Sequence, residues 1–430
     1  MAGWGTIYNN TSFALRRQAG ELARLQEQAA SGARINRVSD APSDAYRVMR
    51  LRAQIDSFQV YSKNLGEVSR VLELSNNVLI KASTRITSVK QLLTQVASGT
   101  YGPVARATVA EQIDAILEEV LSLANTKSLG RYILGGTSSS AAPFVARRSD
   151  GSITAVDYQG SQDELLVPVA PGVEYVGLLT GDSAFRQEDR QAPVFMGATG
   201  AMPGTATSTV RGDVHLTATH TLTSYSGGSG LAAGTSSAGG DTILGAHVLT
   251  IIVARGENTI RLDGGEPVTF QGTEQDLQVT GPAGEVVHVN LESWAGFEGD
   301  ITITGTGKLT IDNSDSFTNL TSFTDNVAVT DSGTGRILYV DTTDVLRTGT
   351  EPVRVAGTHD LFGVLINARD LLANDRNLST GKQLELLGHA LTALDSVQQV
   401  VLTKGTSAGA RLQAMDALKQ SMETIENSAS

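Results

Sequence analysis

The chain has 430 residues, of which 40% are hydrophobic and only 5% aromatic, with 45 glycines and no cysteine. That length fits about two or three domains, but the shortage of aromatic residues favours thin helical layers and turn-rich β structure over one bulky core. The absence of cysteine excludes disulfides, thiolate zinc sites and cysteine nucleophiles.

The net charge of −12 is unevenly distributed along the chain. Residues 136–360 carry 11 Lys and Arg against 27 Asp and Glu, a net −16, whereas residues 1–135 carry 16 against 11, a net +5. An acidic middle binds nucleic acid poorly and favours a solvated outer surface. No stretch is apolar enough for a membrane span, and the first residues lack the apolar core of a cleaved secretory signal. We therefore expect neither a nucleic-acid nor a membrane partner.

The first predicted helix has a weak apolar stripe of mostly small residues. Leu15, Ala19, Leu22, Gln26 and Ala29 recur at helical spacing. Such a stripe predicts a helix that packs mainly against other chains or is poorly ordered alone.

A break follows in the stretch "SGARINRVSDAPSDAYRV", residues 31–48. Gly32 can adopt the left-handed conformation that ends a helix, Asp40 can cap the next helix, and Pro42 is tolerated in its first turn. The segment therefore predicts a joint between two helices. On these residues alone, an ordinary loop without a special role is the favoured alternative.

The clearest pattern is a heptad seam between Leu51 and Val96, whose positions follow one another at alternating steps of three and four. No proline interrupts it, so it predicts a single helix of about 70 Å at ~1.5 Å per residue. The candidate seam residues are Leu51, Phe58, Tyr61, Leu65, Val68, Leu72, Leu79, Ile86, Val89, Leu93 and Val96.

Two further helical regions can cover this seam. After "SGTYGP" at 98–103, a second stripe contains Ile113, Ile116 and Val120, which predicts an antiparallel pair. Helical stripes return near residue 361, and we expect two short C-terminal helices there. An ordinary bundle core explains all these stripes, but the length of the seam demands more cover than the C-terminal helices give and favours an assembly surface as well. The C-terminal seam residues are Leu387, Leu391, Leu394 and Val401.

Between the helical ends the periodicity changes to two. Segments such as "HVLTIIVA" at 247–254 and "DITITGTGKLTID" at 300–312 are β-branched and punctuated by glycine. The expected fold class is a multidomain α+β protein, in which the N- and C-terminal segments form an elongated antiparallel helical bundle or coiled coil around a large all-β insertion in the middle. The expected domains are a terminal coiled-coil segment with the joint (1–42), a helical bundle (43–138 and 361–430), a first β domain (139–200 and 336–360) and an additional outer β domain (201–335).

The sequence offers no recognisable catalytic or cofactor constellation. The histidines show none of the i, i+4 helical pairing of a zinc hydrolase, and "GGSGLAAG" is neither a phosphate-binding loop nor a nucleophile elbow. We predict a protein that is not an enzyme and has no catalytic residue, cofactor or metal site.

The joint resembles a motif of the flagellin superfamily, in which a Ser/Thr-Gly, an Arg-Ile and an Asp-x-Pro recur where the terminal coiled coil meets the next layer. The matching joint residues are Gly32, Arg34, Ile35, Asp40 and Pro42. The resemblance gives this segment its role as a joint.

A second set of residues is similar to the hook-filament junction family within that superfamily. The stretches "SLANTKSLGRYILGGTSSSAAPF" and "VDYQG" match that family's motifs after the third helix and in its first β-strands. The matching residues are Asn125, Gly130, Arg131, Tyr132, Gly136, Thr137, Pro143, Phe144, Tyr158 and Gly160.

The resemblance implies a structural axial protein of the bacterial flagellum, exported through the flagellar type III apparatus and located outside the cell at the hook-filament junction. It implies assembly with itself into a ring, and contact with the first hook-associated protein, flagellin and a cytosolic export chaperone. It also implies a further apolar helix beyond residue 430. Two alternatives stay open, a flagellin-type filament subunit and a surface-exposed adhesin or glycan-binding module in the β insertion.

Overall fold

The computed structural model describes residues 3–32, 34, 41–98, 101–254, 256–312, 316–376 and 378–429. The chain divides into two compact units: residues 1–76, 163–179 and 406–430 form the first, and residues 77–162 and 180–405 form the second. This division differs from the four domains predicted above, which stay a prediction. The helices are α1 (Gly3–Ser31), α2 (Pro42–Ala97), α3 (Pro103–Ala124), α4 (Gly181–Phe185), α5 (Ser237–Gly240), α6 (Leu361–Ala373) and α7 (Thr380–Ala429).

The first unit contains α1, the beginning of α2, the end of α7 and one β-hairpin. The hairpin joins β5 (Leu165–Ala170) to β6 (Val173–Leu178), and its carbonyl at Pro168 accepts a hydrogen bond of 2.9 Å from the Asn64 amide of α2. Met415 of α7 is fully buried, and its sulfur lies 3.6 Å from the Ser69 hydroxyl of α2. Front and rear helices therefore pack together within this unit.

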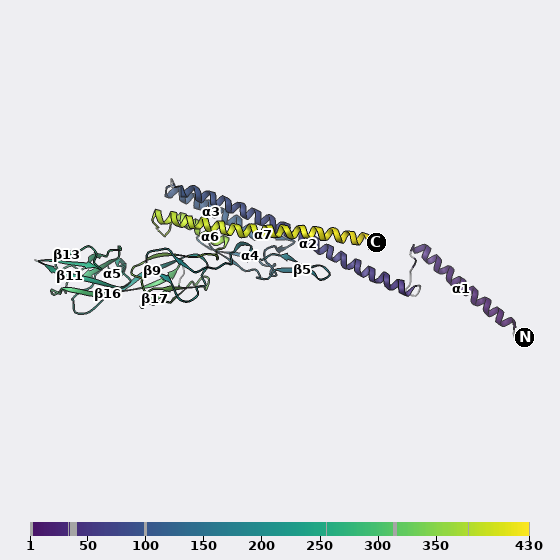
Figure 1. Cartoon of the computed structure of the whole chain (residues 1–430), viewed down its shortest axis with the longest axis horizontal. Coiled ribbons are helices and arrows are strands. Elements are labelled where there is room, and N and C mark those ends of the chain that lie inside the picture. The colour runs from purple at the N-terminus through teal and green to yellow at the C-terminus, as the bar shows by residue number, and fades with distance from the viewer. Residues whose placement is uncertain are drawn as a thin grey trace. The chain divides into compact units, whose positions relative to one another are not determined.

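The helical part of the second unit is a bundle of the rest of α2, α3, α6 and the first part of α7. Figure 1 shows α6 beside α3, and Arg369 of α6 bonds Asp114 of α3 at 2.6 Å. Helix α6 begins at Asp360, whose carboxylate accepts the Gly363 N–H at 2.9 Å, as an N-cap residue does. Its apolar residues then face the bundle, so the expected packing of N- and C-terminal helices around a shared core is confirmed.

Helix α7 runs without a break for 50 residues. The prediction of two short C-terminal helices is therefore wrong, because α6 is short but α7 is not. The stretch "LTKGTSAGAR" at 402–411 interrupts the apolar stripe with two glycines, yet it contains no proline. Glycine costs a helix only about 1 kcal/mol, and neighbouring helices compensate for that amount.

The β region is antiparallel throughout its described pairs. Its main sheet has the strand order β13, β12, β11, β16, β9, β20, β7, with β17 also paired to β16. The strands are β1 (Lys127–Ser128), β2 (Arg131–Tyr132), β3 (Phe144–Ser149), β4 (Ser152–Tyr158), β7 (Val194–Phe195), β8 (Met202–Pro203), β9 (Gly212–Tyr225), β10 (Ala232–Ala233), β11 (Gly245–Ala254), β12 (Glu257–Leu262), β13 (Val268–Phe270), β14 (Leu277–Thr280), β15 (Val286–Asn290), β16 (Gly299–Ile311), β17 (Thr318–Leu320), β18 (Val327–Thr330), β19 (Ile337–Asp341) and β20 (Gly349–Val355).

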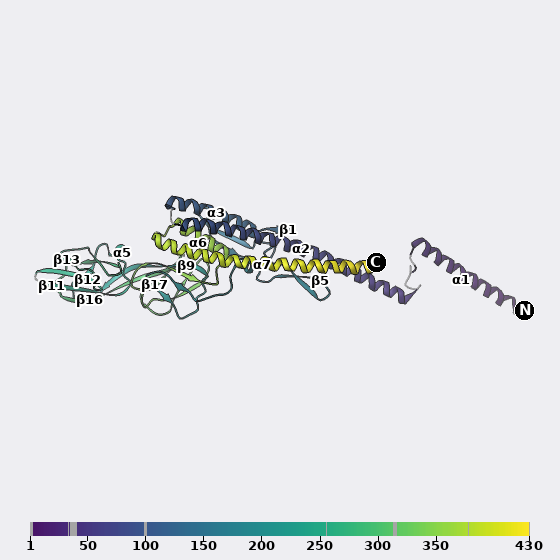
Figure 2. The same cartoon turned by 45° about the horizontal axis from the view of Figure 1, so that its top comes forward.

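Two cores divide this β region into two modules. The first β module has Leu309, Val329 and Leu338 in its core, and the second β module has Ile260, Val279 and Val287. Strand β16 belongs to both, since Ile301 and Ile303 lie in the second core and Leu309 and Ile311 in the first. Figure 2 shows β11, β12, β13 and β16 grouped in the second module, with β9 and β17 next to them.

The two modules repeat one strand plan. In the second module β12 pairs with β13 and the β14–β15 hairpin follows, with Val279 opposite Val287. In the first module the end of β16 pairs with β17 and the β18–β19 hairpin follows, with Val329 opposite Leu338. The repeat allows positions in one module to be compared with matching positions in the other.

Candidate functional site

Helix α1 presents an uncovered set of apolar side chains. Six of them are between 59% and 75% exposed: Ile7, Tyr8, Phe13, Leu15, Leu22 and Leu25. In water an isolated amphipathic helix gains little stability from its own backbone, and it becomes stable by burying its apolar face. Helix α1 therefore has the surface of an element that is covered by another chain or segment.

Along α2 the seam changes from exposed to buried. Leu51 is 45% exposed, Phe58 and Tyr61 are half-buried, and Leu65 is fully buried. Beyond that point the remaining predicted seam residues of α2 are all buried: Val68, Leu72, Leu79, Ile86, Val89, Leu93 and Val96. The N-terminal part of α2 adds further exposed apolar side chains, Tyr46, Met49 and Val60 among them. We call these exposed residues of α1 and of α2 up to Val60 the terminal apolar surface.

The predicted seam residues of the other helices are mostly buried too. Ile113, Val120, Leu387, Leu394 and Val401 are buried, whereas Ile116 and Leu391 are half-buried at the edge of the bundle. They fill the core of this chain, so they offer less to a neighbouring molecule than the terminal apolar surface does.

Among the described residues of the joint, side-chain contacts link the end of α1 to the start of α2. Gly32 has the left-handed backbone expected at a helix end, with φ of 68°. The Arg34 guanidinium lies 2.6 Å from the Asp44 carboxylate in the first turn of α2, and the Gln28 amide of α1 donates to the Arg34 carbonyl. Pro42 is the first residue of α2, as predicted, while Ile35 and Asp40 lie outside the described residues. The joint therefore ties the end of one helix to the start of the next.

The family-motif residues meet where the helical bundle adjoins the first β-strands. The side chain of Asn125 makes two hydrogen bonds to the backbone of Phe144. Its amide donates to the Phe144 carbonyl at 2.8 Å, and its oxygen accepts the Phe144 N–H at 3.1 Å. The Phe144 ring packs against Tyr158 of β4 and Phe362 of α6, with centroids 5.1 and 5.0 Å away. Phe185 of α4 completes this aromatic cluster. Sequence reasoning missed the contact with Phe362, which carries no local signal of its distant partners.

Tyr158 links three segments of the motif through its hydroxyl. The oxygen lies 3.1 Å from the Leu134 carbonyl and 2.9 Å from the Ser161 carbonyl, and it accepts the Gly181 N–H. Burial raises the pKa of this phenol, so it keeps its proton at neutral pH. The same ring explains the glycine at position 160, because a Cβ there would lie 2.5 Å from the Tyr158 ring.

The other motif residues lie close by along the chain. Arg131 and Tyr132 form β2, and the Lys127 ammonium sits over the Tyr132 ring at 4.5 Å. The Pro143 carbonyl accepts the Gln159 N–H at 2.7 Å. The remaining members, Gly130, Gly136 and Thr137, lie in the turns around β2. The motif is therefore a connector between helices and β-strands.

A polar groove of ≈710 Å³ lies beside the first β module and α6. Two of its acidic residues are paired with bases: Asp213 lies 3.2 Å from His359 and 3.6 Å from Arg354, and Asp312 lies 3.3 Å from His215. Burial alone would raise the pKa of Asp213, but the hydrogen bond and charge of His359 and the charge of Arg354 outweigh it and lower that pKa. These ion pairs stabilise the fold, and among the described residues the groove shows no nucleophile held by a base.

The bacterial flagellin N-terminal helical region is the family model that matches this chain, over residues 6–139. That range includes α1, the joint, α2 and α3. The chain is 29% identical to flagellar hook-associated protein 3 of Salmonella typhimurium over 140 residues, which are 32% of this chain and 44% of the relative. Its N-terminal region is therefore of the bacterial flagellin type.

The chain is also similar to a second curated relative and to a solved structure. Flagellar hook-associated protein 3 of Escherichia coli is 26% identical over 181 residues, 42% of this chain and 55% of the relative. The solved flagellar hook associated protein-3 from Legionella pneumophila is 15% identical with a TM-score of 0.47, covering 89% of this chain and 96% of that one. The chain spans about half the length of the curated relatives it matches.

The family match covers the terminal apolar surface and stops at residue 139, at the connector motif. Within the described residues, no helix is both long and apolar enough to cross a membrane. The family resemblance seen in the sequence is confirmed, whereas the roles of individual seam, joint and motif residues stay predictions.

Proposed function

We propose that this protein is a structural component of the bacterial flagellum that forms the junction between hook and filament. The single observation that supports this most is the terminal apolar surface on α1 and the first part of α2, which continues directly into the buried seam of the bundle. A stripe that is core in one half of a helix and exposed in the other is suited to packing against further helices.

In this proposal the exposed and the buried parts of the α2 apolar stripe have different roles. The buried part, from Leu65 to Val96, holds the chain's own bundle together. The exposed part would pack against neighbouring copies in a ring, the first hook-associated protein on one side and flagellin on the other. Before export, a cytosolic chaperone would cover the same surface. The acidic β region would face water outside the cell.

The proposed function has no catalytic step. Its work is mechanical, since interlocked helices resist axial force through many small packing contacts. The names of the relatives support a flagellar location.

A complementation experiment tests this proposal. A strain lacking the gene is supplied with the wild-type chain or with the double variant Leu22→Asp/Leu25→Asp, which places two charges on the exposed apolar side of α1. We expect the wild type to restore filaments and the variant to leave hooks without filaments, because burying an unpaired carboxylate at a helix interface is costly.

The matched control is Asn9→Asp/Ala23→Asp, which adds the same charge on the side of α1 opposite Leu22 and Leu25, at 100° per residue. It should restore filaments like the wild type. Normal filaments with the Leu22/Leu25 variant would contradict the proposal. Hooks that keep a junction ring but lack all filament in the deletion strain would favour a filament subunit instead.

A further inference from the structure

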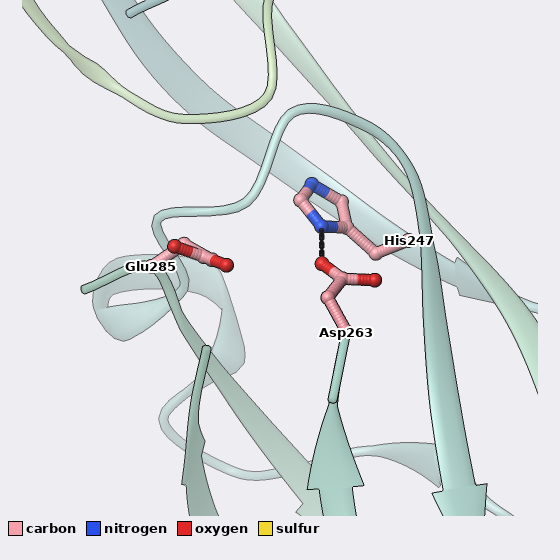
Figure 3. A group of neighbouring side chains, drawn as sticks. All are labelled: His247, Asp263 and Glu285. Atoms are coloured by element: carbon pink, nitrogen blue, oxygen red, sulfur yellow. Dashed lines mark hydrogen bonds and ion pairs between the residues drawn. The ribbon is translucent and has the colours of Figure 1, made fainter. Parts of the chain in front are cut away.

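Three potential metal ligands from separate strands meet at one edge of the second β module. They are His247 of β11, Asp263 directly after β12 and Glu285 directly before β15. One donor atom from each lies within 4.8 Å of the other two, and Figure 3 shows the three side chains converging. The sequence prediction of no metal site examined the spacing of histidines along helices, where this arrangement leaves no trace.

The hydrogen bonds of His247 fix which ring nitrogen can bind a metal. Its Nε2 lies 2.9 Å from the carbonyl oxygens of both Leu244 and Leu346. Carbonyls only accept, so this nitrogen carries the proton, and in the neutral ring Nδ1 has a free lone pair. Metal-binding histidines characteristically donate their second N–H to a backbone carbonyl in this way. The imidazole is also 2% exposed, so it is held in place.

Asp263 directs one carboxylate oxygen at that nitrogen. Its Oδ2 lies 2.5 Å from His247 Nδ1, while its Oδ1 accepts the Val248 N–H at 2.8 Å. The second oxygen is therefore anchored to the backbone, and the first is available to a cation that replaces the proton between the two residues.

Glu285 is a buried carboxylate that lacks a cationic partner. It is 5% exposed, and its Oε2 accepts the Ala283 N–H at 3.0 Å. Among the described residues, no Lys, Arg or His nitrogen lies within 4.0 Å of it. A buried charge without a counter-charge is costly. A divalent cation between Glu285, Asp263 and His247 would supply the missing positive charge.

The repeated strand plan provides an internal comparison. Asp312 of the first module matches Asp263: both have φ near 45°, and Asp312 Oδ1 accepts the His215 N–H as Asp263 accepts that of Val248. The residue that matches His247 is then Val214. Arg336 matches Glu285. The Arg336 carbonyl accepts the Asp331 N–H and the Glu285 carbonyl accepts the Gly281 N–H, and each bond closes its hairpin. The aspartate therefore serves the turn in both modules, and the turn requires neither His247 nor Glu285.

We propose that the second β module binds one zinc ion through His247 Nδ1, Asp263 Oδ2 and the Glu285 carboxylate, with water as the fourth ligand. One nitrogen and two carboxylates suit Zn²⁺, whereas Ca²⁺ takes six to eight oxygen ligands. Tetrahedral bonds of about 2.0–2.1 Å need ligand atoms roughly 3.3 Å apart, so Nδ1 and Oδ2 separate slightly and the proton between them leaves. The ion would join β11, the turn after β12 and the β14–β15 hairpin.

The test uses the full chain, freed of metal by a chelator. Zinc is titrated by isothermal calorimetry and thermal unfolding is followed with and without it. We expect one zinc per chain and a rise in the melting temperature of the β region by about 5 °C or more at a zinc concentration of about 100 times Kd. Equal concentrations of Ca²⁺ or Mg²⁺ should leave it unchanged.

Two variants make the test specific. Glu285→Gln keeps the shape of the side chain and removes its charge, so the metal-free protein should unfold at the wild-type temperature or above, and the zinc-dependent rise should disappear. His215→Gln changes the His215–Asp312 pair of the first module, which lacks a third carboxylate. This variant should keep the full zinc-dependent rise in melting temperature. Absence of zinc binding to the wild type, or an equal rise in Glu285→Gln, would overturn the proposal.

Discussion

Lys90 of α2 donates a hydrogen bond to Gln398 of α7, with Nζ 3.1 Å from Oε1, although the two residues are 308 positions apart in the chain. The Gln398 amide in turn donates to the Thr87 hydroxyl at 2.9 Å and to the Ser83 carbonyl at 3.2 Å. One glutamine therefore joins the C-terminal helix to two turns of α2. The relationship shows directly that the two ends of the sequence form one bundle.

Replacing Gln398 by alanine should lower the free energy of unfolding by about 1–3 kcal/mol, since it leaves several half-buried polar groups without their partner. Urea denaturation followed by circular dichroism measures the change. The exposed neighbour serves as control, and Gln399→Ala should change the free energy by less than about 0.5 kcal/mol. Equal effects of both variants would show that the contact contributes nothing.

The two ends of the α2 seam should respond differently to truncation. Leu79 is 1% exposed, so Leu79→Ala should cost about 2–5 kcal/mol of stability through lost burial and a cavity. Leu51 is 45% exposed, and Leu51→Ala should cost below about 0.5 kcal/mol while it weakens assembly. Denaturation curves and a pelleting assay of assembled protein measure the two effects. A large stability loss for Leu51→Ala would contradict its place on an exposed surface.

Alanine at two glycines should act in opposite directions. At Gly160 the added Cβ meets the Tyr158 ring at 2.5 Å, so Gly160→Ala should disturb the Tyr158 hydrogen bonds and lower the melting temperature. At Gly66 within α2 no atom lies within 4 Å of the added Cβ. Gly66→Ala should therefore raise stability by about 0.5–1 kcal/mol, the helix preference of alanine. Calorimetry on both variants tests this, and a stabilising Gly160→Ala would refute the close approach.

The buried Asp213 should make stability depend on pH in the acid range. Its pKa in the folded protein is below the ordinary value, because His359 and Arg354 outweigh the effect of burial. The carboxylate therefore stabilises the fold fully above the ordinary aspartate pKa of about 3.9, and this stabilisation is lost as the pH falls towards the folded pKa.

Asp213→Asn removes this contribution and leaves the buried Arg354 without its partner. The gap in unfolding free energy between wild type and variant should shrink as the pH falls below about 4. Urea titrations at several pH values measure the gap. A gap that stays the same down to pH 3 would show that Asp213 does not titrate as described.

Periodicity alone was enough to predict α1, α2 and α3. Apolar residues at alternating steps of three and four place one side of α2 against its neighbours, and this depends only on residues a few positions apart. The change to a period of two likewise marked the β region. The sequence missed the continuity of α7, because glycines near 405 blur the stripe and only packing against neighbouring helices compensates for them.

Which residues far apart in the chain meet was decided by the tertiary structure. Phe144, Phe185 and Phe362 come from β3, α4 and α6. His247 lies in β11 and Glu285 directly before β15, and no local pattern specifies how these strands are placed. The point at which the α2 seam becomes buried also depends on where α7 lies beside it. Local spacing determines the face that a helix or strand offers, whereas contact between distant segments depends on how all of those faces can be buried at once.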